Sequence, residues 1–304
     1  MAVNHLEIKG FLVFKDEFKA DFVPGANVII GGNGTGKTTL LKAMYNNLRM
    51  VESGSLPEKT QAAINTEHKP HLNSIRIDIG DGIFKNAVYI PEKDLLEHAK
   101  GLLPFMEEKQ TGFSHIYKDV LVKAMDVPTQ KQTELQKVLG DRIAGVIGGH
   151  ITWDQGDGNF YTIKTNGGRI PFSNEASGFK KLGFLGLLIA SGQIVPGTVL
   201  FWDEPENSLN PELVPVLVDI LLELSRNGVQ IFIATHSEIL AEYFSVLRKK
   251  NGGDEVKFFS LYKDGEKIGY DAGDRFDLLT PNSLAAEPVK LYELEIERGL
   301  GGNG

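Results

Sequence analysis

The chain has 304 residues, of which 41% are hydrophobic, enough for one large α/β domain or a core domain with an inserted lobe. Its formal net charge of −8 argues against a globally basic nucleic-acid-binding protein. The absence of cysteine excludes disulfides, thiolate metal sites and cysteine nucleophiles, and it suits a reducing compartment such as the cytoplasm. No apolar run approaches the roughly 20 residues of a membrane span, and the start lacks a signal-peptide pattern, so we expect a cytoplasmic protein without a membrane partner.

The first elements predicted along the chain are short strands around a single helix. Residues 3–9 and 17–23 alternate apolar and polar side chains and predict an antiparallel strand pair. An apolar strand at 27–31 then enters a glycine-rich loop, and a helix follows at 37–49.

Residues 31–38 read G-G-N-G-T-G-K-T and satisfy the pattern G-x-x-x-x-G-K-[ST] between a strand and a helix. Glycines let successive N–H groups converge on phosphate oxygens, and the helix adds its positive N-terminal end. We therefore expect Lys37 to reach the β- and γ-phosphates of a nucleotide and act in catalysis, and the Thr38 hydroxyl to hold Mg²⁺. The residues predicted to bind nucleotide here are Gly31, Gly32, Asn33, Gly34, Thr35, Gly36, Lys37, Thr38 and Thr39.

The segment after the first helix changes character twice. The polar stretch 52–73 predicts a surface loop, and strands are expected at 74–79 and 87–90. Residues 92–147 then predict an inserted helical lobe, which divides a core domain into 1–91 and 148–298. The helices expected in this lobe span about 93–101, 113–126 and 129–140, separated by Pro104, Gly112 and Pro128.

Residues 150–172 return to alternation of period two and contain two turn signals, which predict antiparallel strands. A helix is expected at 175–192, directly after a Ser- and Asn-containing segment. Ser177 and Gly178, at the start of this helix, offer a hydroxyl and N–H groups to an anion, so we predict that they bind nucleotide held by a second protomer. A plain helix N-cap is the alternative interpretation.

Two acidic residues follow a second apolar strand, Thr198 to Trp202. At the carboxyl end of a strand beside the phosphate loop, Asp203 is predicted to hold Mg²⁺. Glu204 faces another way, and we expect it to polarise a water in line with the γ-phosphate. A surface Asp-Glu turn before Pro205 is the alternative.

A third apolar strand, at 229–234, leads to His236, which we expect to contact the γ-phosphate and act in catalysis. Helices at 211–226 and 237–248 and a strand at 256–261 complete the alternation. This pattern predicts an α/β fold with a mostly parallel sheet, an antiparallel β lobe and the inserted helical lobe. The glycine-rich tail 299–304 is expected to be disordered.

These segments, in this order, resemble the ATP-binding-cassette (ABC) ATPase superfamily of P-loop NTPases, in its SMC- and RecF-like soluble branch. The opening Leu6–Phe11 through Gly34 is similar to the N-terminal lobe of those proteins, and Asp203 with Glu204 to their Walker B acids. Residues 206–211 resemble the D-loop region, and His236 the switch histidine. More narrowly, the chain resembles single-chain AAA-type ATPases related to the ATPase domain of overcoming-lysogenization-defect (OLD) nucleases.

The resemblance implies ATP and Mg²⁺ as cofactors, ATP hydrolysis, and a homodimer that closes around two ATP molecules. Two positions depart from the family pattern. The signature L-S-G-G-Q is here Ala176-Ser177-Gly178-Phe179-Lys180, and Glu92 stands near the place of the Q-loop glutamine, where it could approach the metal or cap a helix. No nuclease domain is expected after the last strand, so we expect a nuclease or toxin effector to be a separate polypeptide.

Three further interpretations stay open at the level of sequence. One is a nucleotide-gated interaction scaffold with negligible turnover for such an effector, as in phage defence. Another is a small-molecule kinase with a phosphate loop, which the Asp203-Glu204 tandem and the 92–147 insertion fit poorly. The third is DNA binding through the short basic clusters Lys180-Lys181 and Arg248–Lys250, which are otherwise solvated helix faces.

Overall fold

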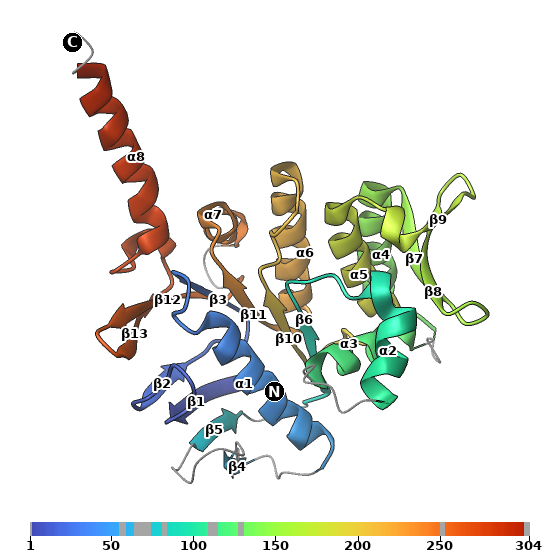
Figure 1. Cartoon of the computed structure of the whole chain (residues 1–304), viewed down its shortest axis with the longest axis horizontal. Helices are drawn as coiled ribbons and strands as arrows, with labels where there is room; N and C mark the ends of the chain where they lie inside the picture. The colour runs from blue at the N-terminus through green and yellow to red at the C-terminus, as the bar shows by residue number, and fades with distance from the viewer. Residues whose placement is uncertain are drawn as a thin grey trace.

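A six-stranded sheet forms the centre of the molecule (Figure 1). The computed structural model describes residues 2–54, 59–63, 74–80, 84–108, 115–126, 131–249 and 253–300. The strand order is β13-β12-β3-β11-β10-β6, and all neighbours are parallel except β13, which pairs antiparallel with β12. The strands are β3 (Ala26–Gly31), β6 (Asn86–Ile90), β10 (Thr198–Asp203), β11 (Gln230–Thr235), β12 (Val256–Asp264) and β13 (Lys267–Gly273).

The central strands are buried on both faces, and alternate side chains enter two different cores. On β10, Leu200 and Trp202 pack into one hydrophobic cluster, whereas Val199 and Phe201 pack into the other. This follows from the period of two in a strand, which sends successive side chains to opposite faces. Every residue of β3, β10 and β11 is buried, as expected for parallel strands that are covered on both sides. The predicted fold class is confirmed.

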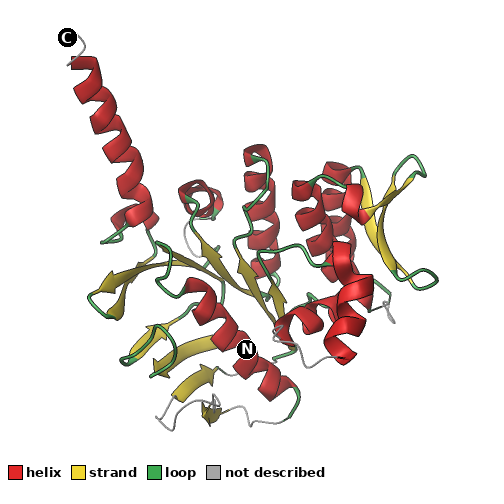
Figure 2. Cartoon of the chain, viewed as in Figure 1, coloured by secondary structure: helices red, strands yellow, loops and turns green. Residues whose placement is uncertain are grey.

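Helices and a second sheet cover these two faces (Figure 2). One face packs against α1 and an antiparallel sheet of order β2-β1-β5-β4, and the other packs against α5, α6 and α7. A three-stranded antiparallel sheet, β7-β8-β9, lies beside α4 and α5. The antiparallel strands are β1 (Val3–Lys9), β2 (Phe18–Asp21), β4 (Lys59–Ala63), β5 (Ser74–Ile79), β7 (Gly149–Asp154), β8 (Asn159–Lys164) and β9 (Arg169–Pro171).

The helices of the predicted insertion, 92–147, pack against the rest of the chain. Side chains of α3 and α4, such as Leu121 and Ile143, belong to the same hydrophobic cluster as Leu185 on α5. The proposed division into a core domain and a helical lobe therefore remains a prediction. The helices are α1 (Lys37–Glu52), α2 (Ala99–Glu108), α3 (His115–Met125), α4 (Glu134–Ile147), α5 (Ser177–Ala190), α6 (Val214–Arg226), α7 (Glu238–Leu247) and α8 (Ser283–Leu300), with single 3-10 turns η1 (Leu96–His98), η2 (Phe172–Asn174), η3 (Pro211–Leu213) and η4 (Phe276–Leu278).

Two predicted helix boundaries within the insertion are wrong. Helix α2 continues through Pro104, which was expected to interrupt it. Helix α4 begins after Thr133 because a capping box forms there: the Thr133 hydroxyl accepts from the Gln136 N–H at 3.3 Å, and the Gln136 side chain accepts from the Thr133 N–H at 2.7 Å. Gly148 then ends α4 in the left-handed conformation. Gly112 and Pro128 lie outside the described residues.

Three further elements differ from the sequence prediction. Part of the expected loop at 52–73 is strand β4, which pairs with β5, while 55–58 and 64–73 lie outside the described residues. Beyond residue 261, β12 continues and forms a hairpin with β13. Helix α8 then projects from the body (Figure 1) and includes the first two residues of the tail expected to be disordered, while 301–304 lie outside the described residues. None of the described helices is long and apolar enough to cross a membrane.

Candidate functional site

The loop between β3 and α1 depends on glycine at several positions. Gly31 has φ 148° and Gly36 has φ 95°, in the region that favours glycine. A Cβ atom on Gly31 would lie 2.4 Å from the Leu261 carbonyl oxygen, and one on Gly36 would lie 2.9 Å from the ring of Phe14. The glycines therefore allow both a tight turn and a close approach to β12 and the chain before β2. The exposed residues of the loop are Gly32, Asn33 and Gly34.

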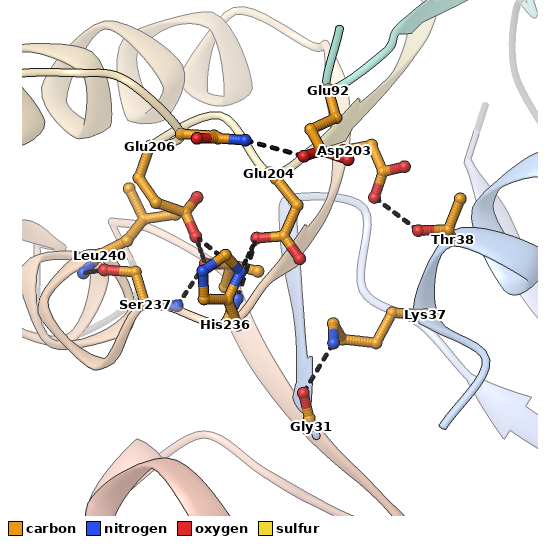
Figure 3. A network of polar contacts seen from close by, with 12 residues as sticks. Gly31, Lys37, Thr38, Glu92, Asp203, Glu204, Glu206, His236, Ser237 and Leu240 are labelled. Carbon is orange, nitrogen blue, oxygen red and sulfur yellow. Dashed lines mark hydrogen bonds and ion pairs between the residues drawn. The ribbon is translucent and has the colours of Figure 1, made fainter. Parts of the chain in front are cut away.

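Lys37, the first residue of α1, folds back over this loop. Its buried Nζ donates to the carbonyl oxygen of Gly31 at 2.6 Å (Figure 3) and to that of Gly32 at 3.3 Å. Burial lowers the pKa of Lys37, and the charge of Glu204 is the largest influence that opposes this shift, because it favours the ammonium form. Thr35, by contrast, is buried and donates its hydroxyl to Gly32 O at 2.9 Å, so it stabilises the loop from within.

Asp203, at the end of β10, joins α1 to β6. The Thr38 hydroxyl donates to Asp203 Oδ1 at 2.9 Å, and the Tyr89 hydroxyl donates to Asp203 Oδ2 at 3.2 Å. Burial raises the pKa of Asp203, although both hydrogen bonds oppose the shift. The sequence analysis missed Tyr89, which it placed only within an apolar strand; the signal available was its position one residue before the carboxyl end of β6.

Glu204 and His236 form a second pair at the ends of β10 and β11. The His236 backbone N–H donates to Glu204 Oε2 at 3.1 Å, and the His236 Nδ1 contacts the same oxygen (Figure 3). Glu204 has φ 48°, an uncommon conformation for a residue other than glycine, asparagine or aspartate. Burial raises the pKa of Glu204 to about 7, and neighbouring Glu206 contributes to the same shift.

Glu206 is a third acid that the sequence analysis did not assign to the site. Its side chain is only 10% exposed; Oε1 accepts a hydrogen bond of 2.5 Å from the Thr235 hydroxyl and lies 3.8 Å from His236 Nδ1. One ligand atom from each of Glu204, Glu206 and His236 lies within 4.8 Å of the others, a spacing that could hold a metal ion. Within this group His236 contacts Glu204, whereas Glu206 Oε1 is engaged by Thr235 and Glu206 Oε2 is buried without a hydrogen-bond partner among the described residues. The sequence offered one signal for Glu206, which is its position two residues after Glu204 in the segment that resembles the D-loop.

Lys37, Thr38, Glu204 and His236 open onto one cavity of about 310 Å³. It is lined by Val13, Asn33, Gly34, Gly36, Lys37, Thr38, Thr39, Glu92, Glu204 and His236. Glu92 follows β6 and accepts a hydrogen bond of 2.8 Å from the Asn207 amide, so it is tied to the segment after β10. The fold thus brings together at one edge of the sheet the side chains that the sequence analysis selected from three separate regions.

Ser177 and Gly178 are not among the residues that line this cavity. They begin α5, where Ser177 is exposed and Gly178 lies against the segment after β10. The two lysines that follow point inward and do not form a solvated basic face: Lys180 donates to Glu97 at 2.6 Å, and Lys181 donates to the Glu204 carbonyl oxygen at 2.8 Å. Lys250, of the other basic cluster, lies outside the described residues.

Comparisons with known proteins agree with this architecture. Residues 1–80 match a family model described as "AAA ATPase domain", and residues 102–242 match one described as "AAA domain, putative AbiEii toxin, Type IV TA system". The chain is 25% identical to a glutamine transport ATP-binding protein of Bacillus subtilis (strain 168) over 209 residues, covering 69% of this chain and 68% of that protein. It is 26% identical over 259 residues to an energy-coupling factor transporter ATP-binding protein of Mesomycoplasma hyopneumoniae (strain J), covering 85% and 72%.

Among solved structures, the chain is similar to an SMC head bound to the C-winged helix domain of ScpA. The TM-score is 0.54 at 13% identity, and the match covers 90% of this chain and 98% of that chain. This degree of likeness establishes the shared fold. The narrower resemblance to the ATPase domain of OLD nucleases stays a prediction. The two partial family models and the shared fold support the assignment of the chain as an ABC- and SMC-like P-loop ATPase.

Proposed function

We propose that this protein binds ATP with Mg²⁺ and hydrolyses it, and that ATP binding joins two copies to control a partner effector protein or a DNA transaction. The observation that carries the proposal is that Lys37, Thr38, Glu204 and His236 line one cavity at the carboxyl ends of β3, β10 and β11, with Asp203 hydrogen-bonded to Thr38. Nucleotide sites of open α/β sheets lie at this edge. ATP binding and hydrolysis are also general properties of the family.

Phosphate binding needs little rearrangement of the loop. The N-terminus of α1 lines the cavity through Gly36, Lys37, Thr38 and Thr39, and the dipole of the helix favours negative charge there. Lys37 is the residue that must move, because its Nζ is now bonded to Gly31 O and Gly32 O. A phosphate oxygen offers the ammonium a stronger, charge-assisted hydrogen bond than a carbonyl does, so ATP would release Lys37 from the loop.

Thr38 and Asp203 fit Mg²⁺ by the chemistry of their donors. A hydroxyl and a carboxylate are the hard oxygen ligands that this ion prefers. Burial of Asp203 penalises its charge, and a cation beside it would offset this penalty. When bound, Mg²⁺ would neutralise charge that develops on the transferred phosphoryl group. Glu92, which also lines the cavity, is a further oxygen donor within the same space.

Glu204 is the proposed general base. A pKa of about 7 keeps part of the carboxyl group ionised near neutral pH and makes it basic enough to accept a proton from water. His236 now contacts this carboxylate, so the two must separate before Glu204 can orient a water molecule. The imidazole is 58% exposed and therefore free to turn toward the γ-phosphate, where it would stabilise the transition state.

Dimerisation is proposed because the second predicted anion-binding segment does not line the cavity. Ser177 and Gly178 lie at the N-terminus of a 14-residue helix, α5, and are not among the residues around the cavity of their own protomer. In a closed dimer they would face the nucleotide of the partner copy and add their N–H groups to its phosphates.

The hydrolysis part is tested by steady-state turnover of the wild-type protein, Glu204→Gln and Glu212→Gln with Mg²⁺ and ATP. Glu212 is exposed on η3, so its variant is a matched carboxyl-to-amide control. We expect wild-type turnover with Glu212→Gln and a loss of at least about 100-fold with Glu204→Gln. Turnover by Glu204→Gln at the wild-type rate would overturn the assignment of the base.

The dimerisation part is tested by the molar mass of Glu204→Gln with and without ATP. A doubling of the mass with ATP, abolished by Ser177→Arg, is the expected result. Because Ser177 is exposed, arginine can be accommodated in the monomer while it obstructs a contact with a second copy. A mass that ATP leaves unchanged would contradict ATP-driven assembly.

A nucleotide-gated scaffold with negligible turnover is a second candidate. It is favoured by the match of residues 102–242 to a model whose description names a toxin–antitoxin system, in which a separate effector would be the partner. Single-turnover assays separate the candidates. Bound ATP that remains intact over many hours, with and without DNA, would favour the scaffold.

A further inference from the structure

The segment that follows β10 is a tight loop with two residues in the left-handed region. Glu204 has φ 48° and Ser208 has φ 62°, and neither is glycine. The backbone N–H of Asn207 donates to Glu204 O at 3.1 Å, and that of Leu209 donates to Glu206 O at 2.9 Å. Residues other than glycine rarely adopt this backbone conformation. It is therefore maintained only where surrounding contacts hold the backbone in place. Glu204, the proposed general base, therefore belongs to a loop with a strained backbone.

Helix α5 contacts this loop at both strained residues. Lys181 Nζ donates to the Glu204 carbonyl oxygen at 2.8 Å. One turn earlier, Gly178 packs so closely that an added Cβ would lie 3.5 Å from Ser208 O and 3.3 Å from Leu209 Cδ1. Positions i and i+3 lie on one face of a helix, so Gly178 and Lys181 form a single surface that rests on the loop.

Lys181 is suited to this contact by its surroundings. Its side chain is half-buried, which lowers the pKa of the ammonium group, but the carboxylates of Glu206, Glu92 and Glu204 lie around it and favour the charged form. A charged donor makes a stronger hydrogen bond to a carbonyl than a neutral one does. The Glu204 carbonyl oxygen thus receives two hydrogen bonds, one from its own turn and one from α5.

We propose that Lys181 is a positioning residue that links the N-terminus of α5 to the backbone of Glu204. The inference rests on the proposed function, in which Ser177 and Gly178 meet the partner's nucleotide. When that contact forms, a shift of α5 is transmitted by Lys181 to the Glu204 carbonyl oxygen, and the loop turns the carboxylate of Glu204 relative to His236. Hydrolysis at one nucleotide is thereby made to depend on occupation of the other.

Lys180 provides a matched control on the same helix. It is buried and donates to Glu97 at 2.6 Å and to Ser173 O at 3.0 Å, so it joins α5 to η1 and η2. Neither of these contacts involves the loop after β10. Replacement of Lys180 or Lys181 by methionine therefore removes one positive charge from α5 in each case, but only the second replacement removes the hydrogen bond to Glu204.

The experiment compares Lys181→Met, Lys181→Arg and Lys180→Met with the wild-type protein. For each we would measure the single-turnover rate of ATP hydrolysis, the Kd of a fluorescent ATP analogue, and the midpoint of thermal unfolding. We expect Lys181→Met to lower the rate at least tenfold with an ATP Kd within about twofold of wild type. Lys181→Arg, which keeps a charged donor, should recover most of the rate, and Lys180→Met should stay within about threefold of wild type.

The outcomes separate the coupling from the ATPase function itself. A wild-type rate with Lys181→Met, or equal losses with Lys180→Met and Lys181→Met, would overturn the coupling and leave the ATPase intact. Wild-type protein that binds but never hydrolyses ATP would overturn the proposed function instead. If Lys181→Met does not fold, Lys181→Leu, which also removes the donor and keeps an apolar side chain, is measured under the same expectations.

Discussion

The Tyr89 hydroxyl, on β6, donates a hydrogen bond of 3.2 Å to Asp203 Oδ2 at the buried end of β10, 114 positions away in the sequence. The opposite oxygen of the same carboxylate accepts from Thr38. Tyr89 therefore fixes one oxygen of Asp203 and leaves the other directed at the start of α1, where the proposed Mg²⁺ ligands meet.

Substitution Tyr89→Phe should weaken both folding and metal use. Loss of the hydroxyl leaves a buried carboxylate oxygen without its donor, which costs about 1–3 kcal/mol of stability. Asp203 is also freer to turn, so the Mg²⁺ concentration that supports half-maximal hydrolysis should rise several-fold. Urea unfolding and a Mg²⁺ titration of turnover measure the two effects.

Tyr45→Phe is the matched control for that prediction. The Tyr45 hydroxyl, on α1, donates to Asp119 at 3.1 Å, away from the cavity. Its loss should reduce stability but leave the Mg²⁺ dependence unchanged. The role given to Tyr89 would be wrong if both variants had the wild-type Mg²⁺ dependence.

Substitution Gly36→Ala should destroy nucleotide binding. The added methyl group would lie 2.7 Å from Val13 Cγ2 and 2.9 Å from the Phe14 ring, at a φ of 95° that alanine avoids. We expect a loss of about 1–3 kcal/mol of stability and no measurable ATP binding by calorimetry.

Gly140→Ala tests whether that effect is specific to the loop. Gly140 lies inside α4, and an added Cβ would meet no atom within 4 Å. Alanine there should raise the stability by about 0.5–1 kcal/mol because it favours the helix, and ATP binding should not change. Equal ATP affinity in both variants would contradict the proposed role of the loop.

Glu204 should make the folded state less stable as the pH rises. Its pKa is about 7 in the fold against 4.5 for an unperturbed carboxyl group, so between these values the folded chain binds more protons than the unfolded chain. The contribution of Glu204 to stability is therefore fully present below about pH 4.5 and is lost as the pH rises to about 7.

The comparison of Glu204→Gln with Glu212→Gln isolates this contribution. Unfolding in urea is measured from pH 5 to 8 without nucleotide and with a chelator, so that no cation occupies the site. Glu204→Gln should flatten the fall of stability with pH, whereas the exposed Glu212→Gln should follow the wild-type curve. Parallel curves for all three proteins would show that the Glu204 carboxyl group titrates normally.

Substitution His236→Ala should reduce turnover and leave ATP binding nearly intact. The imidazole is proposed to stabilise the transition state, and removal of one such donor lowers kcat on the order of 100-fold. Because His236 is 58% exposed, the fold should tolerate alanine with little loss of stability. His150→Ala, at an exposed position on β7, is the control and should keep the wild-type kcat. A normal kcat with His236→Ala would exclude a catalytic role.

Much of the cavity could be predicted because its parts are local in sequence. The phosphate loop is one run of residues with a required backbone shape, and an acid or histidine at the end of an apolar strand falls at the same sheet edge as its neighbours. The alternation of helices and strands likewise predicts a parallel sheet, which the order β12-β3-β11-β10-β6 bears out. The predicted start of α4, at residue 129, is wrong although the capping box of Thr133 and Gln136 is a local sequence signal.

Other features arise only when distant segments pack together. Lys181 and Glu204 are 23 positions apart, and the lysine reads in sequence as part of a basic surface cluster, yet it donates to a buried backbone carbonyl. From the sequence, Tyr89 is predicted only as a core residue of a short strand. Its hydroxyl can donate to Asp203 only because β6 lies in register beside β10. Local chemistry thus predicts which groups touch the nucleotide, and that assignment stays a prediction. The residues that orient those groups are decided by tertiary packing, because the sequence around a donor does not indicate which distant carboxylate or carbonyl it will meet.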